Sequence, residues 1–247
     1  MKEIREIIKA YDAAQKQGKQ TALATVVHVD GSSYRRPGAR MLITEDGELT
    51  GAISGGCLEG DALRKALLVM VQQRSMLVTY DTMDEDDAKL GIGLGCNGII
   101  QVLIEPIHED DVNNPIQLLK IIAAQRQRAV LVTLFSLENK KDRQHGTCLL
   151  LKDDQTTYGD APIMKDILTI DAKDVLANQI SLFKNYTSET RSLTAFIELI
   201  KPGIALIIIG AGNDVMPLVA MADVLGWDTT IVDGRANYAI ERLRRKK

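Results

Sequence analysis

The stretch "IIIGAGNDVMPLVAMADVLGWDTTIVDGR", Ile207–Arg235, decides the fold class. An isoleucine run precedes a glycine-rich turn, an apolar segment of helical length follows, and a β-branched run ends at Asp233. A strand, a helix and a second strand in this order predict a βαβ unit with parallel strands. We therefore predict an α/β protein, with a mixed α/β N-terminal domain followed by a partial Rossmann-like βαβ unit.

The glycine-rich turn of this unit resembles part of a dinucleotide fingerprint. Gly210 and Gly212 directly follow the first strand, and Asp233 ends the second. In that fingerprint the glycines let a pyrophosphate approach the backbone, and the acidic residue binds a ribose hydroxyl. Val215 stands at the third glycine position, where glycine permits close helix–strand packing. One functional alternative is therefore an NAD(P)-binding oxidoreductase that uses this "GAGNDV" segment.

The stretch "KPG", Lys201–Gly203, precedes this unit and is typical of a linker. We predict a domain boundary there, with residues 1–200 as one domain and residues 201–247 as the start of a second. A doubly wound nucleotide-binding domain needs about five or six strands, and the residues after Gly203 suffice for two. The second domain is expected to be incomplete, completed by another chain, or packed onto the first. An exposed strand edge then favours a homodimer.

Hydrophobic periodicity predicts the elements of the N-terminal domain. Helices are expected over residues 2–17, 58–73, 114–127 and near 162–176. A hairpin within residues 39–54 turns at Glu45–Gly47. Further strands are expected over 21–30, 75–82, 98–107, 129–137, 146–151 and near 191–199.

The loop "DGSSYRRPGARM", Asp30–Met41, joins the first strand to the second. Glycine and serine expose N–H groups and hydroxyls, and arginine offers a planar fork for an anion. We predict a phosphate or carboxylate site here; the alternative is an ordinary polar hairpin loop. The candidate binding residues are Ser32, Ser33, Arg35, Arg36 and Gly38.

The stretch "SGGCLEGD", Ser54–Asp61, follows a strand and opens a helix. The N-terminus of a helix favours anions and lowers the pKa of a thiol. Gly55 and Gly56 carry no side chains, so a ligand can approach the backbone closely. We predict that Cys57 is functional; the alternative is a small buried apolar residue, the common fate of a free cysteine.

A second cysteine, Cys96, follows Gly95 in "GIGLGCNG", Gly91–Gly98. Glycine at this density loses conformational entropy on folding, so either a ligand or a sharp turn should require it. We predict a functional role for Cys96 and a core position for Cys148, which lies in an apolar strand. The histidines show no zinc-ligand spacing, so no metal site is predicted. A cysteine-nucleophile transferase or hydrolase is a further alternative, with His28 or His108 as its base.

Composition narrows the function classes. The formal net charge of the 247 residues is −3, and aromatic residues are 4%, which argues against a nucleic-acid partner. No apolar run approaches the roughly 20 residues needed to span a bilayer, and the N-terminus is unlike a signal peptide. Three cysteines without a disulfide-like spacing are expected to stay reduced. We expect a cytoplasmic protein with no membrane partner.

These motifs together resemble the XdhC/CoxI family. "TVVHVDGSSYRRPGARMLI", "GAISGGCLEGD" and "GIGLGCNG" are similar to its N-terminal domain, and "IIGAGNDVMPLVAMADVLGWDTTIVD" to the start of its Rossmann domain. Asn213 replaces the histidine that usually follows Gly-Ala-Gly in the family.

The resemblance implies a maturation factor for molybdenum hydroxylases such as xanthine dehydrogenase, and a non-catalytic chaperone more than an enzyme. Such a factor binds molybdenum cofactor (molybdopterin), protects it during sulfuration and passes it to the apoenzyme. A molybdenum hydroxylase apoenzyme and a cysteine desulfurase are the implied partners. The cofactor's phosphate would bind Arg35, Arg36 and glycine N–H groups, while Cys57 or Cys96 would contact the metal or carry sulfur.

Overall fold

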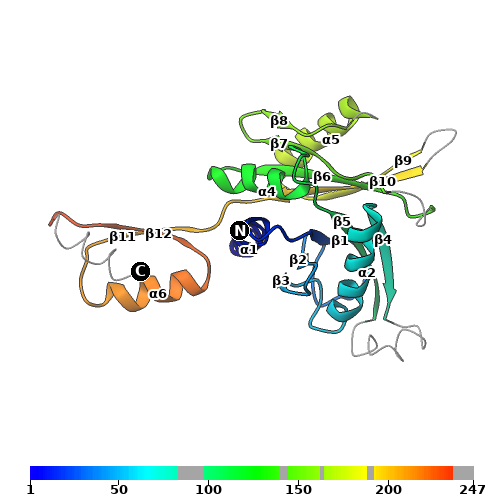
Figure 1. The fold of residues 1–247 in the computed structure, drawn as a ribbon. Helices are drawn as coiled ribbons and strands as arrows, with labels where there is room; N and C mark the ends of the chain where they lie inside the picture. The colour runs from blue at the N-terminus through cyan, green and yellow to red at the C-terminus, as the bar shows by residue number, and fades with distance from the viewer. Residues whose placement is uncertain (83–96, 140–143, 162–163, 188–191, 236–247) are drawn as a thin grey trace. The chain divides into compact units, whose positions relative to one another are not determined.

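The computed structural model describes residues 1–82, 97–139, 144–161, 164–187 and 192–235. The chain forms two compact units, which are described separately (Figure 1). The larger unit is Glu3–Ile200, and the smaller joins Met1–Lys2 to the residues from Lys201 onward. In the described part of the chain, no helix is both long and apolar enough to cross a membrane.

The first half of the larger unit forms an antiparallel sheet, sheet A, in the strand order β3-β2-β1-β5-β4. Its central strand β1 pairs with β2 on one side and with the distant β5 on the other. Helix α1 leads into the sheet, and helix α2 joins β3 to β4. The elements are α1 (Lys2–Lys16), β1 (Thr21–Gly31), β2 (Arg40–Thr44), β3 (Leu49–Gly51), α2 (Glu59–Gln72), β4 (Met76–Asp81) and β5 (Gly98–Pro106).

The second half forms another antiparallel sheet, sheet B, in the order β8-β7-β6-β10-β9. Helix α4 leads into this sheet, and the Asn114 side chain caps it by accepting a hydrogen bond from the N–H of Gln117 (3.0 Å). The elements are α4 (Pro115–Ala124), β6 (Ala129–Phe135), β7 (Gly146–Lys152), β8 (Thr157–Tyr158), α5 (Lys165–Asn178), β9 (Leu182–Thr187) and β10 (Ser192–Ile200).

The alternation of side chains along the strands places the two sheets face to face. In β5, Val102 packs with α2 whereas Leu103 packs with Phe135 and Phe196 of sheet B. The same alternation in sheet B directs Ile197 toward α5. Because successive residues of a strand point to opposite faces, the order of layers is α2, sheet A, sheet B, α5 (Figure 1).

Polar contacts made by Arg40 and by Glu105 cross the interface between the sheets. Buried Arg40 of β2 forms an ion pair with Glu198 of β10, and one of its nitrogens donates to the carbonyl of Gly38 (2.8 Å). Buried Glu105 of β5 accepts hydrogen bonds from the N–H (2.7 Å) and hydroxyl (2.9 Å) of Thr147 in β7. Burial raises the pKa of Glu105, and the bonds from Thr147 and the charge of Arg40 offset this only in part.

The smaller unit contains a βαβ segment, as the sequence predicts. Strands β11 (Ala205–Ile209) and β12 (Asp228–Val232) pair in parallel through helix α6 (Val215–Val224). Much of its apolar surface is exposed; Ile209, for example, has a relative exposure of 88%. The predicted α/β fold class is confirmed, and strands β8 and β9 are elements that the periodicity did not reveal.

Candidate functional site

Two of the predicted loops meet where β1 ends and β5 begins. Gly31 lies opposite Gly98 in the β1–β5 register, and the N–H of Ser32 donates to the carbonyl of Asn97 (2.9 Å). A side chain at Gly31, whose φ is +79°, would approach that carbonyl to 2.6 Å. Glycine is therefore required here by a left-handed backbone and by close approach. The loop after β1 is thus joined to the C-terminal end of the "GIGLGCNG" stretch.

Tyr34 brings the third loop to the same place. A Cβ atom built on Gly55 would lie 3.3 Å from Cγ of Tyr34, so the tyrosine ring lies on the backbone of Ser54–Asp61, here called the Gly–Cys loop. The ring is nevertheless 73% exposed. A large aromatic ring held on a glycine and open to solvent is a ready surface for stacking a flat ligand. Sequence reasoning missed Tyr34; the signal was a lone aromatic residue among serines and arginines.

The Gly–Cys loop is held by a network centred on Ser54. The Ser54 hydroxyl accepts hydrogen bonds from the N–H groups of Gly56 and Leu58 (both 3.1 Å) and donates to the carboxylate of Glu59. Glu59 also accepts from the N–H groups of Ile53 (3.2 Å) and Ser54 (2.8 Å). Burial opposes ionisation of Glu59, but these hydrogen bonds prevail and lower its pKa. Glu59 therefore stays charged and fixes the loop.

Cys57 lies within this loop, two residues before the start of α2. Its Sγ atom is 3.6 Å from Oγ of Ser54, and its side chain is partly buried against the core between α2 and sheet A. Neighbouring Gly56 has a φ of +116° and no atom within 4 Å of where a Cβ would be. The thiol is thus held in place beside an open stretch of backbone.

The two arginines of the first loop differ in their surroundings. Arg35 forms an ion pair with Glu3 of α1, and the Ser33 hydroxyl donates to the carbonyl of Arg35 (2.6 Å). Arg36 is exposed and has no ion-pair partner among the described residues. Arg36 is therefore the arginine that is available to an anion, whereas Arg35 and Ser33 order the loop.

Gly38 closes the loop against the second sheet. Its φ is +92°, and a Cβ atom there would collide with the carboxylate of Glu198. Because Arg40 holds both that carboxylate and the carbonyl of Gly38, this glycine has an architectural reason to be present.

Of the other two cysteines, Cys96 and Cys148, only Cys148 lies within the described residues. Cys96, with its neighbour Gly95, lies outside the described residues. Cys148 packs against the core between α5 and sheet B. Burial, together with Glu105 and Asp160, raises the pKa of its thiol to about 12. The Cys148 thiol therefore stays protonated, and this partly buried residue packs against the core rather than within it.

His28 is one of the two candidate bases for a cysteine nucleophile. Its ring meets Phe183 of β9 edge to face (4.9 Å between centroids), and its Nδ1 atom is 3.5 Å from Asp30. Among the described residues, no hydrogen bond or ion pair joins His28 to Cys57.

The glycine loop of the smaller unit is held by Asp233. The carboxylate of Asp233 accepts from the N–H of Ala211 (2.7 Å), which lies between Gly210 and Gly212. It also accepts from the backbone and guanidinium of Arg235, and these hydrogen bonds lower its pKa far below the usual range. The acidic residue that would bind a ribose in a dinucleotide site thus ties the two strand ends of its own unit together.

The geometry defines a mixed α/β protein with a glycine-rich, thiol-bearing loop site at one end of sheet A. Residues 14–81, which contain two of the three loops, match the model of the XdhC and CoxI family. Together with the relatives below, this match supports assignment of the chain to that family.

Individual relatives agree with this assignment. The chain is 30% identical over 232 residues to a Bacillus subtilis protein described as a probable xanthine dehydrogenase subunit, covering 94% of this chain and 65% of the relative. It is 33% identical over 103 residues to the molybdenum cofactor insertion chaperone PaoD of Escherichia coli, covering 42% of this chain and 31% of the relative.

A solved structure shares the fold. It is described as a xanthine dehydrogenase from Bacillus halodurans, with a TM-score of 0.68, 31% identity, and coverage of 94% of this chain and 64% of that one. The chain thus spans less than two thirds of the length of each of these relatives.

Proposed function

We propose that this chain is a molybdenum cofactor-binding accessory factor in the maturation of a xanthine dehydrogenase-type molybdoenzyme. The names of the relatives support this role, since one is a cofactor insertion chaperone and another belongs to a probable xanthine dehydrogenase. The match to the family model also includes both the loop Asp30–Met41, which carries Arg35 and Arg36, and the Gly–Cys loop.

The observation that carries the proposal is the contact between Tyr34 and Gly55. Through it, a stacking ring, an exposed guanidinium at Arg36 and a thiol at Cys57 belong to one pair of touching loops. Molybdenum cofactor has a flat pterin, a phosphate and a sulfur-bound metal. These groups match an aromatic face, an arginine fork and a soft thiolate respectively. The residues present therefore fit the cofactor as cargo.

We assign roles to this chain's residues accordingly. Arg36 and the open backbone at Gly56 bind the phosphate, and Tyr34 orients the pterin. Cys57 either contacts the metal end of the cofactor or carries sulfur during sulfuration. A cysteine desulfurase and the apoenzyme are the protein partners of this proposal, and a homodimer is its assembly.

The proposal does not extend to NAD(P), which stays a prediction for the smaller unit. There the Asp233 carboxylate is already bound to Ala211 and Arg235, and Val215 occupies the position of the third glycine. A dinucleotide would have to compete with these hydrogen bonds for its ribose contact.

The test is the pterin content of the purified protein. The chain is expressed in cells that make molybdenum cofactor, purified without oxygen and oxidised, and the fluorescent pterin is measured. We expect near-stoichiometric pterin in the wild type and its loss in Cys57→Ala and Arg36→Ala. Cys148→Ala, at a partly buried cysteine outside the proposed site, and Arg74→Ala, at an exposed arginine just after α2, are the matched controls. Absence of pterin from the wild type would refute the proposal, and equal loss in the controls would refute the assigned site.

A further inference from the structure

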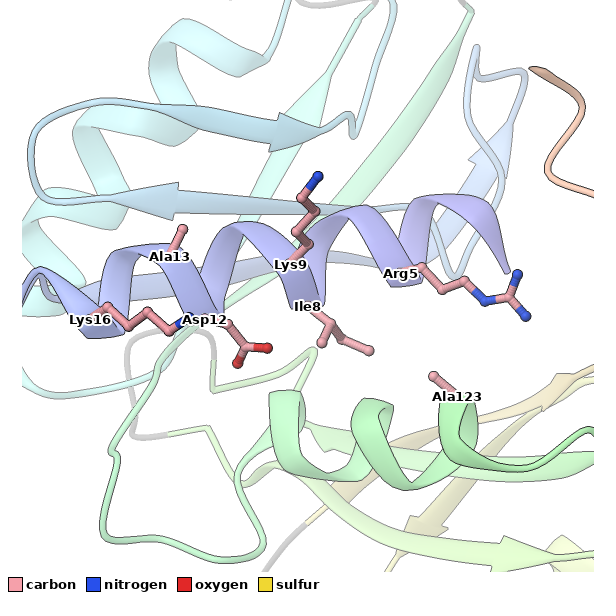
Figure 2. A pocket seen from close by; sticks show the side chains of 7 residues that line it. All are labelled: Arg5, Ile8, Lys9, Asp12, Ala13, Lys16 and Ala123. Atoms are coloured by element: carbon pink, nitrogen blue, oxygen red, sulfur yellow. The ribbon is translucent and has the colours of Figure 1, made fainter. Parts of the chain in front are cut away.

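A groove of about 470 Å³ lies between helices α1 and α4. In Figure 2, Ile8 and Asp12 lie on the side of α1 that faces α4, where Ala123 contributes from the opposite wall. The other lining residues are Arg5, Lys9, Ala13 and Lys16 of α1. These positions recur every three or four residues, so they form one stripe along the helix. Ile4, Ile7, Tyr11 and Ala14 form the buried stripe of the same helix.

The groove is cationic because the acid in its lining is already paired. The carboxylate of Asp12 forms an ion pair with Nζ of Lys120 on α4 (2.7 Å), and Lys120 also lies over the ring of Tyr11. Lys9 and Lys16 are exposed and form no ion pair with any residue in the described part of the chain. These two lysines place positive charge beside the apolar lining residues Ile8, Ala13 and Ala123.

We propose that this groove binds an acidic amphipathic helix of a protein partner. The apolar lining residues suit leucine-type side chains spaced at helical intervals, and Lys9 and Lys16 suit flanking glutamates or aspartates. The stripe from Arg5 to Lys16 is about three helical turns long, which sets the length of the partner segment. The inference rests on the proposed function, which requires a partner protein, and identifies where that partner docks.

The lining of the groove favours a protein helix over a lipid surface. Ile8 is only partly exposed, and the other apolar residues of the lining are the small side chains of Ala13 and Ala123, so the groove offers little apolar surface for insertion into a bilayer. Amphipathic helices that bind membranes instead present an outward apolar face with large hydrophobic residues. A groove between helices resembles the sites that receive a single amphipathic helix.

The test uses a labelled 12-residue peptide with leucines at helical spacing and glutamates between them, followed by fluorescence anisotropy. Wild-type protein is compared with Lys9→Glu/Lys16→Glu. The matched control is Lys165→Glu/Lys173→Glu, which makes the same charge change at exposed positions of α5. Ala13→Trp blocks the groove without changing its charge. A peptide with lysines in place of the glutamates, and vesicles of phosphatidylserine and phosphatidylcholine, complete the set.

We expect the wild type and the α5 control to bind the acidic peptide equally, and binding to fall at least tenfold in Lys9→Glu/Lys16→Glu and in Ala13→Trp. Raising the salt concentration should weaken wild-type binding, because exposed charges are screened. No wild-type binding, equal binding by all variants, or a groove-dependent preference for vesicles would overturn the inference. Pterin content of the same variants is measured in parallel: its absence from the wild type would count against the proposed function, while the peptide result would still decide the groove.

Discussion

Two junctions of this molecule lead from a strand through a glycine-containing turn into a helix, but their structures differ. In the larger unit, a strand leads through Ser54–Cys57 into α2; in the smaller unit, β11 leads through Gly210–Gly212 into α6. In the first junction, Ser54 and Glu59 hold the loop from within its own segment. In the second, the loop N–H is held by Asp233, which directly follows the second strand.

The two helices differ as well. The buried face of α2 packs fully into the core of sheet A through Ala62, Ala66, Val69 and Met70. By contrast, α6 leaves Met221 and Val224 exposed while burying Val215, Val219 and Ala222. Glycines after a strand therefore indicate a turn, but the residue that binds the turn's N–H groups determines whether a ligand has access to them.

The largest expected effect concerns the ion pair between Arg40 and Glu198. This pair supports the loop Asp30–Met41, which contacts the first junction through Tyr34. Glu198→Ala leaves the buried charge of Arg40 without its partner, which should lower the free energy of unfolding by about 3–5 kcal/mol. Urea denaturation measures this directly. The double variant Arg40→Met/Glu198→Leu removes both charges and should recover most of the loss. If the single and double variants were equally unstable, packing rather than charge would hold the loop.

The next largest effect concerns the ring of Tyr34, which lies on the first junction. We expect it to contribute to the retention of pterin. Tyr34→Ala should weaken retention of pterin about tenfold, since stacking on an aromatic side chain contributes about 1–3 kcal/mol. Tyr34→Phe preserves the ring face and should retain pterin as the wild type does. Tyr158→Ala, a partly exposed tyrosine of β8, serves as the control. Equal retention by Tyr34→Ala and the wild type would remove Tyr34 from the site.

A smaller effect concerns Glu59, whose pKa lies below its ordinary value of 4.5 because of its hydrogen bonds. A carboxylate with a lowered folded-state pKa stabilises the fold above its unfolded pKa and loses that contribution as the pH falls through the folded value. Glu59→Gln should therefore cost about 1 kcal/mol at pH 7, allowing for solvent screening. The difference from the wild type should shrink below about pH 4.5. Urea denaturation at about pH 7, 5 and 3.5 measures it; a difference that is constant with pH would contradict the charged role.

The smallest effect is expected in the second junction. Arg235 is 60% exposed, and exposed ion pairs contribute little to stability. Arg235→Ala should leave the thermal unfolding midpoint unchanged, whereas Ser54→Ala in the first junction should lower it. A clear loss of stability from Arg235→Ala would show that the Asp233–Arg235 pair supports the smaller unit more than its exposure suggests.

Sequence periodicity correctly predicted the helices and strands in which one face, at regular spacing, is buried. Helix α2 and the hairpin of β2 and β3 follow the expected ranges closely. Strand β9 was missed because its first two residues, Leu182 and Phe183, are both partly exposed at the edge of sheet B. The usual alternation of apolar and polar residues is therefore absent there.

The meeting of the site loops could not be predicted from local patterns. It depends on the pairing of β1 with β5, which sets Gly31 opposite Gly98 across a long stretch of chain. It also depends on the position of Tyr34 on Gly55, a tertiary contact without a periodic signature. The sequence alone identified the candidate residues of these loops by their residue types. The different roles of Arg35 and Arg36 became clear only from the ion pair between Arg35 and Glu3 in the structure.

The pairing pattern also has a consequence for the order in which the molecule is made. All strands of sheet A lie within Thr21–Pro106, whereas β10, which carries Glu198, ends at Ile200. If the chain folds from its N-terminus as it emerges from the ribosome, the strands of sheet A can pair while Arg40 is still hydrated. The arrival of β10 would then bring Glu198 to that charge and fix the loop that carries Tyr34 and Arg36. A nascent chain stalled before β10 would accordingly present the site in an unlocked form.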